Sequence, residues 1–311
     1  MENTILGLHH ITAIAGNAKI NYDFYTRILG LRLIKKTVNF DDPETYHLYY
    51  GNETGAPGTI LTFFPWEGIA AGRRGARQAT EIGYSVPEGS LDFWQARLEK
   101  NNVIYNKQAE KFGEKYLTFL DPDGLKFELT VGKNKDTRTP WVTSDITAEN
   151  AITGFHQVTI TTNKIDKTAE ILTDIFGYGL LEKQVNRSRF ITNAVDQANL
   201  VDLVEAPGEI AGHVAGGSVH HVAFRVNDEQ TLMYFRDKIA AKGLSITEKI
   251  DRNYFYSLYF REPGGVLFEL ATDNPGFSVD EPLNELGKSL KLPAQYEKQR
   301  AEIESILPKL S

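Results

Sequence analysis

The chain has 311 residues, a length that suits two domains better than one hydrophobic core. Hydrophobic residues make up 41% of it and charged residues 24%, which is typical of a globular protein in water. The formal net charge is −7, which argues against non-specific nucleic-acid binding, because that needs a basic face. The absence of cysteine excludes disulfides, a thiolate nucleophile and a thiolate metal site.

The beginning of the chain shows no targeting pattern. Residues 1–7 have no basic region followed by a long apolar run, so no signal peptide is predicted. No window approaches the roughly 20 apolar residues of a membrane span. We therefore expect a cytoplasmic protein with neither membrane nor nucleic-acid partners.

The first module is predicted to contain a strand, a helix and three more strands. Its opening strand, Gly7 to Ile14, carries two adjacent histidines. A helix is expected from about Ala18 to Leu29, with Gly30 as its stop. Alternating β-branched and aromatic residues then predict three strands, at 32–39, 46–51 and 59–64.

The same order of elements recurs, and this repeat is the main structural signal in the sequence. Ile28-Leu29-Gly30 recurs as Ile175-Phe176-Gly177, 147 positions later. Phe119 to Gly124 recurs as Phe260 to Gly265, 141 positions later, which places Glu128 on Glu269. The modules are assigned to 7–66, 79–132, 153–206 and 217–272.

These modules predict an α+β fold of four βαβββ units in two tandem domains. The polar stretch 133–150 is the expected linker, so the first domain is assigned to 1–140 and the second to 151–272. A C-terminal helical tail, 273–311, carries a helix from about Gln295 to Leu307 with Ile303, Ile306 and Leu307 on its apolar side. We expect it to pack on the module pair that consists of the first and fourth modules, or across a dimer contact.

One constellation in the repeat is suited to metal chemistry. His10 and Thr12 share a strand face, His221 stands at the second position of another His-His pair, and Glu269 lies on the strand that closes the fourth module. If the sheet curls around a cavity, these three ligand candidates (His10, His221 and Glu269) can point inward together. Two imidazoles and one carboxylate suit non-haem Fe(II) and leave positions open for O₂ and substrate.

The other histidines are less persuasive as ligands. His47 and His213 have no carboxylate at a matching spacing, so we expect them on strand or loop surfaces. His156 matches His9 in the repeat and is expected to serve packing. The other half of the repeat has Gln157 where the first module has His10, and Glu81 where the fourth has His221. We interpret it as a degenerate copy, with a bound-cation site as the alternative.

Several motifs of the chain resemble the vicinal oxygen chelate superfamily, which includes glyoxalases and extradiol ring-cleaving dioxygenases. Within it, the sequence is most similar to the group that opens hydroquinones, over nearly the whole chain. The motifs that carry the resemblance are Leu8-His9-His10-Ile11-Thr12, Tyr46-His47-Leu48-Tyr49, Pro57-Gly58-Thr59, Val219-His220-His221, Asp251-Arg252-Asn253 and Pro263 to Glu269.

The resemblance implies a metal between the first and fourth modules, with the second and third forming a metal-free pair. It implies Fe(II), with Mn(II) as an alternative, and roles beside the metal for Arg252 and Tyr259. It also makes His9 and His220 candidates near the pocket, although strict strand alternation turns both away from it. The aromatic run of residues 254–260 could line that pocket; its members are Tyr254, Phe255, Tyr256, Tyr259 and Phe260.

The function expected from these observations is Fe(II)-dependent ring cleavage of an aromatic diol, with hydroquinone as the expected substrate and O₂ as co-substrate. A glyoxalase-type isomerase is one alternative, but it usually takes four protein ligands. The closing strand of the first module, Thr59 to Phe64, has no ligand where the fourth module has Glu269. A second alternative is a quinone- or drug-binding protein without a redox metal. A homo-oligomer is also expected.

Overall fold

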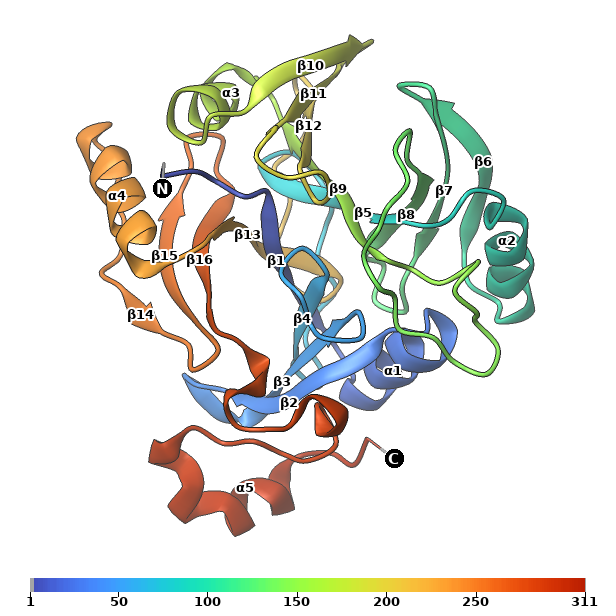
Figure 1. Ribbon diagram of the computed structural model, residues 1–311, viewed down its shortest axis with the longest axis vertical. Helices are drawn as coiled ribbons and strands as arrows, with labels where there is room; N and C mark the ends of the chain where they lie inside the picture. The colour runs from blue at the N-terminus through green and yellow to red at the C-terminus, as the bar shows by residue number, and fades with distance from the viewer. Residues whose placement is uncertain (1–2, 311) are drawn as a thin grey trace.

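The computed structural model describes residues 3–310, which form two eight-stranded sheets (Figure 1). Each predicted module is present, with a strand, a helix and three strands in that order. The predicted α+β class and the four-module plan are therefore confirmed.

The elements have the following bounds. The first module contains β1 (Leu8–Ala15), α1 (Ala18–Asp23), β2 (Arg32–Asn39), β3 (Asp42–Gly51) and β4 (Ile60–Pro65). The second contains β5 (Gln78–Ser85), α2 (Leu91–Lys100), β6 (Tyr105–Lys111), β7 (Glu114–Leu120) and β8 (Lys126–Val131). The third contains β9 (Gly154–Thr162), α3 (Asp166–Glu170), β10 (Gly179–Gln184), β11 (Arg187–Ile191) and β12 (Leu200–Glu205). The fourth contains β13 (Ser218–Val226), α4 (Glu229–Ala241), β14 (Ile250–Asp251), β15 (Phe255–Arg261) and β16 (Leu267–Pro275).

The sheets do not follow the order of the chain. The first sheet has the strand order β14-β15-β16-β13-β1-β4-β3-β2 and joins modules one and four. The second sheet has the order β10-β11-β12-β9-β5-β8-β7-β6 and joins modules three and two. This is the pairing that the resemblance implied. The division into 1–140 and 151–272 stays a prediction, since each sheet draws strands from both ranges.

Helices link the two sheets. Arg97 of α2 donates to the carbonyl oxygen of Ile28 (2.7 Å), just after α1, and Lys238 of α4 donates to that of Ile175 (3.4 Å), just after α3. The predicted helix at 18–29 is present as α1 followed by a π-helical turn at Phe24–Ile28. Gly30 ends it with φ +67°, a conformation that glycine adopts readily. One hydrophobic core contains buried residues from all four modules.

The tail packs on the first sheet, below β2 and β3 in Figure 1. Its predicted helix is a 3₁₀ segment at Ala294–Gln299 followed by α5 (Arg300–Ile306). Ile303 and Leu307 are buried as predicted, but Ile306 is 46% exposed, because at about 100° per residue it lies to one side of the stripe that Ile303 and Leu307 share. Nearer the sheet, buried Lys35 binds Asp280 (2.5 Å) and Glu281 (2.6 Å), which anchors the start of the tail.

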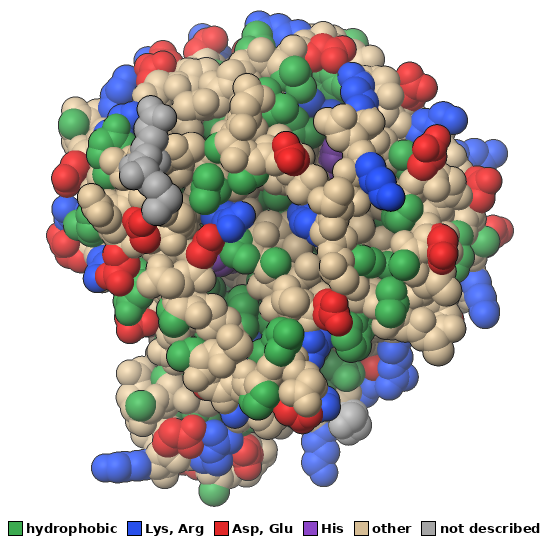
Figure 2. Space-filling model, viewed as in Figure 1, with side chains coloured by type: hydrophobic (Ala, Val, Ile, Leu, Met, Phe, Trp, Pro, Cys, Tyr) green, Lys and Arg blue, Asp and Glu red, His purple; other side chains and the backbone are tan. Residues whose placement is uncertain are grey.

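Among residues 3–310, no helix is both long and apolar enough to cross a membrane. On the face shown in Figure 2, basic and acidic side chains are interspersed around apolar ones.

Candidate metal centre

The predicted ligand candidates meet at the centre of the first sheet. His10 on β1 and His221 on β13 lie on the two central strands, which pair antiparallel with Thr12 opposite His221. Glu269 on β16 lies beside Ala223 of β13. His10 Nε2 is 3.2 Å and His221 Nε2 is 2.8 Å from Glu269 Oε2, and the two nitrogens are 3.3 Å apart. All three residues are buried, and they are the only such group among the described residues.

The arrangement of these atoms fits a cation. Although two imidazole nitrogens are close to Glu269 Oε2, this buried oxygen accepts no directed hydrogen bond from the described residues. The short distances are not hydrogen bonds, because lone pairs that converge on one point cannot bond to each other. Glu269 Oε1 is held separately by the Ser257 hydroxyl. The result is three donor atoms on one side of a common point, as in a facial His-His-carboxylate set.

Two β-bulges place a second histidine behind each imidazole. The register of β1 with β13 shifts between Leu8 and His10, which leaves His9 unpaired, and a second shift leaves His220 unpaired. The extra residue of a bulge is re-aimed. His9 Nδ1 lies 2.9 Å from His10 Nδ1, and His220 Nδ1 lies 2.8 Å from His221 Nδ1. The expectation that strand alternation turns His9 and His220 away was therefore wrong.

These contacts determine the tautomer that metal binding needs. If Nε2 of His10 and His221 binds a metal, Nδ1 carries the proton and donates a hydrogen bond to His9 or His220. Burial holds the pKa of His9 and of His221 below the ordinary value, and it lowers that of His220 to about 4. Burial raises the pKa of Glu269, but the two facing imidazoles more than offset this and hold it well below its usual range. Neutral imidazoles and an ionised carboxylate are the forms that bind metals.

A cavity of about 280 Å³ opens onto His10 and His221, whereas Glu269 lies buried behind its wall; this volume is close to the lower end of the range for small-molecule sites. Arg252 and Tyr259 line it; Arg252 Nε donates to the Tyr259 hydroxyl (3.3 Å), and the Tyr259 ring lies edge-on to His221. Burial raises the pKa of Tyr259, so its phenol stays protonated. The other lining residues are His10, Thr12, Asn39, Phe40, Asp41, His47, Tyr49, Phe64, Trp66, His220, His221, Phe255 and Leu267.

Only part of the predicted aromatic run reaches this cavity. Phe255 and Tyr259 line it, whereas Tyr254 packs against Phe277 of the tail and Phe260 lies in the main core. Tyr256 packs on that core from outside the cavity. Side chains alternate along β15, so a continuous aromatic run must divide between two faces.

His47 is the functional candidate that the sequence analysis missed. It lies in the cavity wall, not on a surface, whereas His213 is exposed as expected. His47 Nε2 is 2.9 Å from the Thr62 hydroxyl, and Nδ1 is 2.9 Å from the Tyr49 hydroxyl. The available signal was the spacing of His47 and Tyr49, two apart on one strand and hence on one face.

The second sheet repeats the geometry without the ligands. Glu81 holds the position of His221, because it lies opposite Thr159 as His221 lies opposite Thr12. Glu128 holds the position of Glu269, because it lies beside Gly83 as Glu269 lies beside Ala223. Cationic side chains neutralise these carboxylates. Lys111 Nζ is 2.6 Å from Glu128, Lys126 Nζ is 2.6 Å from Glu81, and Gln157 donates to Glu128 (2.8 Å). With ammonium groups beside the carboxylates, this half does not offer a cation site.

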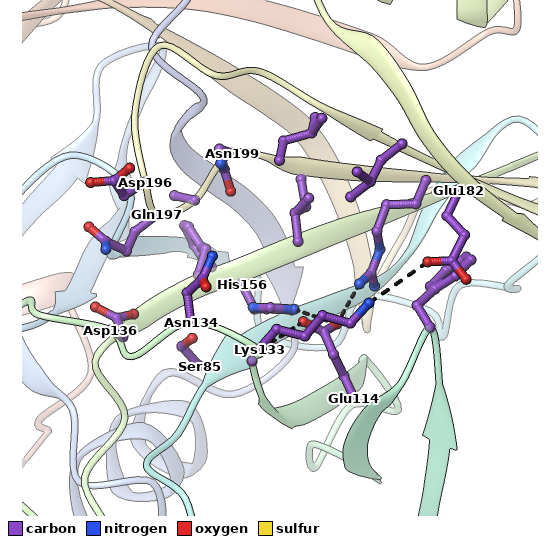
Figure 3. A pocket seen from close by; sticks show the side chains of 18 of the residues that line it. Ser85, Glu114, Lys133, Asn134, Asp136, His156, Glu182, Asp196, Gln197 and Asn199 are labelled. Atoms are coloured by element: carbon purple, nitrogen blue, oxygen red, sulfur yellow. Dashed lines mark hydrogen bonds and ion pairs between the residues drawn. The ribbon is translucent and has the colours of Figure 1, made fainter.

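Figure 3 shows a separate pocket of about 120 Å³ in the second sheet. His156 and Glu114 point toward one another there, with His156 Nε2 3.0 Å from Glu114 Oε2, and buried Arg189 pairs with the same oxygen. Burial raises the pKa of Glu114, but these partners bring it to about 2. His156 is therefore a hydrogen-bond partner of Glu114, not the packing residue that was expected, because its bulge position turns it to Glu114.

A family model described as the Glyoxalase/Bleomycin resistance protein/Dioxygenase superfamily matches residues 7–129 and 154–270. This chain belongs to that superfamily. Members are similar in fold at low identity: glyoxalase I from Zea mays superposes with a TM-score of 0.64 at 15% identity, over 86% of this chain and 92% of that one. That likeness concerns the fold alone.

Other members of the superfamily are similar over nearly the full chain. "Putative ring-cleaving dioxygenase MhqO" of Bacillus subtilis is 46% identical, over 99% of this chain and 98% of that protein. "Chlorohydroquinone/hydroquinone 1,2-dioxygenase" of Sphingobium indicum is 36% identical, over 97% of this chain and 96% of that protein. The crystal structure of a putative dioxygenase from Bacillus subtilis superposes with a TM-score of 0.95 at 45% identity, over 99% of this chain and 98% of that one.

Proposed function

We propose that this chain is an Fe(II)-dependent ring-cleaving dioxygenase for an aromatic diol, with a hydroquinone as its substrate. The observation that carries the proposal is a buried His-His-Glu set whose two histidines line a cavity of about 280 Å³ with aromatic walls. The relative from Sphingobium indicum, which is named for chlorohydroquinone and hydroquinone, supports the substrate class.

In this proposal His10, His221 and Glu269 are the metal ligands, and the metal is Fe(II), with Mn(II) as the alternative. A ferrous ion held there would supply the chemistry that activates O₂ and the diol. His9 and His220 support the ligands, since each can accept a hydrogen bond from the Nδ1–H of its neighbour. His9 lies behind His10 and outside the cavity lining, whereas Thr12 and His220 belong to the cavity wall.

The number of ligands favours an oxygenase over a glyoxalase-type isomerase. Modules one and four are related by the antiparallel pairing of β1 with β13. Thr12 lies two residues after His10, as Ala223 lies two residues after His221. Glu269 of β16 lies beside Ala223, and Thr62 of β4 lies beside Thr12. Thr62 therefore holds the position in module one that Glu269 holds in module four. A threonine hydroxyl is a weaker ligand than a carboxylate, and it is already engaged by Thr12 (2.7 Å) and His47. Three ligands leave room for both substrate and O₂.

Arg252 and Tyr259 are the proposed catalytic residues. The protonated Tyr259 phenol can donate a hydrogen bond to oxygen at the reacting ring, and the Arg252 guanidinium can stabilise an oxyanion there. Replacing Tyr259 by Phe should lower turnover by about 10²-fold or more. Bound iron should stay at the wild-type level, because Tyr259 is not a ligand. Turnover that falls only in proportion to iron content would contradict this role.

The proposed activity can be tested by O₂ uptake after anaerobic Fe(II) loading. We expect uptake with hydroquinone and methylhydroquinone, and the same panel should include catechol and methylglyoxal with a thiol. Turnover of the thiol adduct without O₂, together with no uptake for either class of diol, would favour the isomerase. Failure to retain any metal, with tight quinone binding, would favour the binding protein.

A further inference from the structure

A chain of hydrogen bonds lines one wall of the cavity. The Thr12 hydroxyl is 2.7 Å from the Thr62 hydroxyl, which is 2.9 Å from His47 Nε2, and His47 Nδ1 is 2.9 Å from the Tyr49 hydroxyl. The His47 ring lies between the rings of Tyr49 and Phe64, with centroids 4.1 and 4.3 Å away. The chain therefore runs from β1, the strand of His10, to β3, and packing holds its central imidazole in place.

Both ends of this chain, Thr12 and Tyr49, line the cavity. A neutral His47 donates through one nitrogen and accepts through the other, so the four groups have two consistent proton arrangements. In one of them, each member donates to the next in the order Thr12, Thr62, His47 and Tyr49. The phenol hydrogen of Tyr49 is then left to donate into the cavity. Burial holds the pKa of His47 well below its ordinary value, which keeps the imidazole neutral as this requires.

The second sheet shows that this wall is specific to the half with the ligand candidates. In the first sheet, Thr62 pairs with Thr12 on one side and with Tyr49 on the other. In the second sheet, the matching residue is Asp202, which pairs with Thr159 on one side and with Arg189 on the other. There the members are charged: Arg187 donates to Thr159 (2.8 Å), and Arg189 Nε donates to Asp202 (2.7 Å). A neutral wall ending in a phenol is found only in the first sheet.

We propose that the Tyr49 hydroxyl, oriented by His47 and Thr62, donates a hydrogen bond to the distal oxygen of a para-diol. This deepens the proposed function and rests on it. One oxygen of a para-diol lies at the ligand set, so the other must lie across the ring from it. β3 is two strands from β1, roughly 10 Å in a flat sheet, and the chain of hydrogen bonds covers this span. Tyr49 thus selects para- over ortho-diols, whose two oxygens lie side by side.

The test is a thermodynamic cycle that removes one hydroxyl from the protein and one from the ligand. Hydroquinone and phenol, which lacks the distal hydroxyl, are titrated anaerobically into the Fe(II)-loaded chain. Binding is followed by calorimetry and by tryptophan fluorescence, to which Trp66 contributes from the cavity wall. The variants are Tyr49→Phe and His47→Gln. The control is Tyr50→Phe, whose hydroxyl donates to Asn21 (2.9 Å) on the opposite face of β3.

We expect wild type to bind hydroquinone about tenfold more tightly than phenol, which is the value of one hydrogen bond. Tyr49→Phe should remove this preference and leave phenol binding unchanged, His47→Gln should reduce it, and Tyr50→Phe should keep it. Equal loss of affinity for both ligands in Tyr49→Phe, or no loss, would overturn the inference even if wild type turns over hydroquinone. Failure of wild type to bind either ligand would overturn it together with the proposed function.

Discussion

At the scale of single residues, the bulge positions decide what a histidine can do in this fold. His9 and His220 are the extra residues of two bulges and contact the ligand candidates edge-on. His156 holds the matching bulge in the second sheet and pairs with Glu114. Strict alternation of side chains along a strand does not predict these contacts, because a bulge adds one residue and changes the direction of the next side chain.

The ligand set makes the first residue-scale prediction. His10→Ala, His221→Ala and Glu269→Ala should each reduce bound iron to background, because two remaining ligands hold Fe(II) weakly. Gln157→Ala, at the position of His10 in the second sheet, should bind iron as wild type does. Metal content is measured after anaerobic loading and desalting, with circular dichroism to verify folding. Iron loss in the Gln157 variant, with iron retained by the Glu269 variant, would show that the metal binds in the second sheet and would contradict the proposed ligands.

Glu114 makes a second prediction, for stability against pH. Its folded pKa of about 2 lies below the ordinary 4.5, so the stability that it contributes is complete above pH 4.5 and is lost as the pH falls through about 2. Glu114→Gln should cost on the order of 1–3 kcal/mol at pH 7, because Arg189 loses a charged partner. Its melting temperature should change less between pH 4.5 and 2 than that of wild type. An equally flat profile for exposed Glu99→Gln would contradict this assignment.

At the scale of elements, hydrogen bonds join the tail to the first sheet. Tyr296 donates to the carbonyl oxygen of Phe40 (2.7 Å) at the end of β2, and Lys291 donates its backbone N–H to that of Lys36 (2.9 Å). Phe40 also lines the cavity, so the tail supports one of its edges. The tail thus belongs to the half of the molecule that holds the ligand candidates.

The two isoleucines of α5 provide a matched pair to test this packing. Ile303 is 3% exposed and Ile306 is 46% exposed. Ile303→Ala should lower the free energy of unfolding by about 2–4 kcal/mol, through lost burial and a cavity. Ile306→Ala should change it by less than about 0.5 kcal/mol. Denaturant unfolding measures both, and equal effects would contradict the packing of α5. Deletion of 295–311 should be at least as destabilising as Ile303→Ala.

At the scale of the whole molecule, the repeat in the sequence was enough to predict the modules and to select His10, His221 and Glu269 as ligand candidates, which the structure brings together. The cavity wall was not predictable in the same way. Thr62, His47 and Tyr49 come together through the pairing of β3 with β4 and the curl of the sheet, which no local pattern encodes. The predicted homo-oligomer stays a prediction.

The most direct test of the account is the fate of labelled oxygen. The Fe(II)-loaded protein is supplied with ¹⁸O₂ and one equivalent of hydroquinone, and the product is analysed by mass spectrometry. A ring-cleaving dioxygenase should yield a ring-opened acid in which both atoms of one O₂ are incorporated. The same label should be missing from the reaction of Glu269→Ala. Conversion of hydroquinone to benzoquinone without label, or no conversion by wild type, would contradict the central claim.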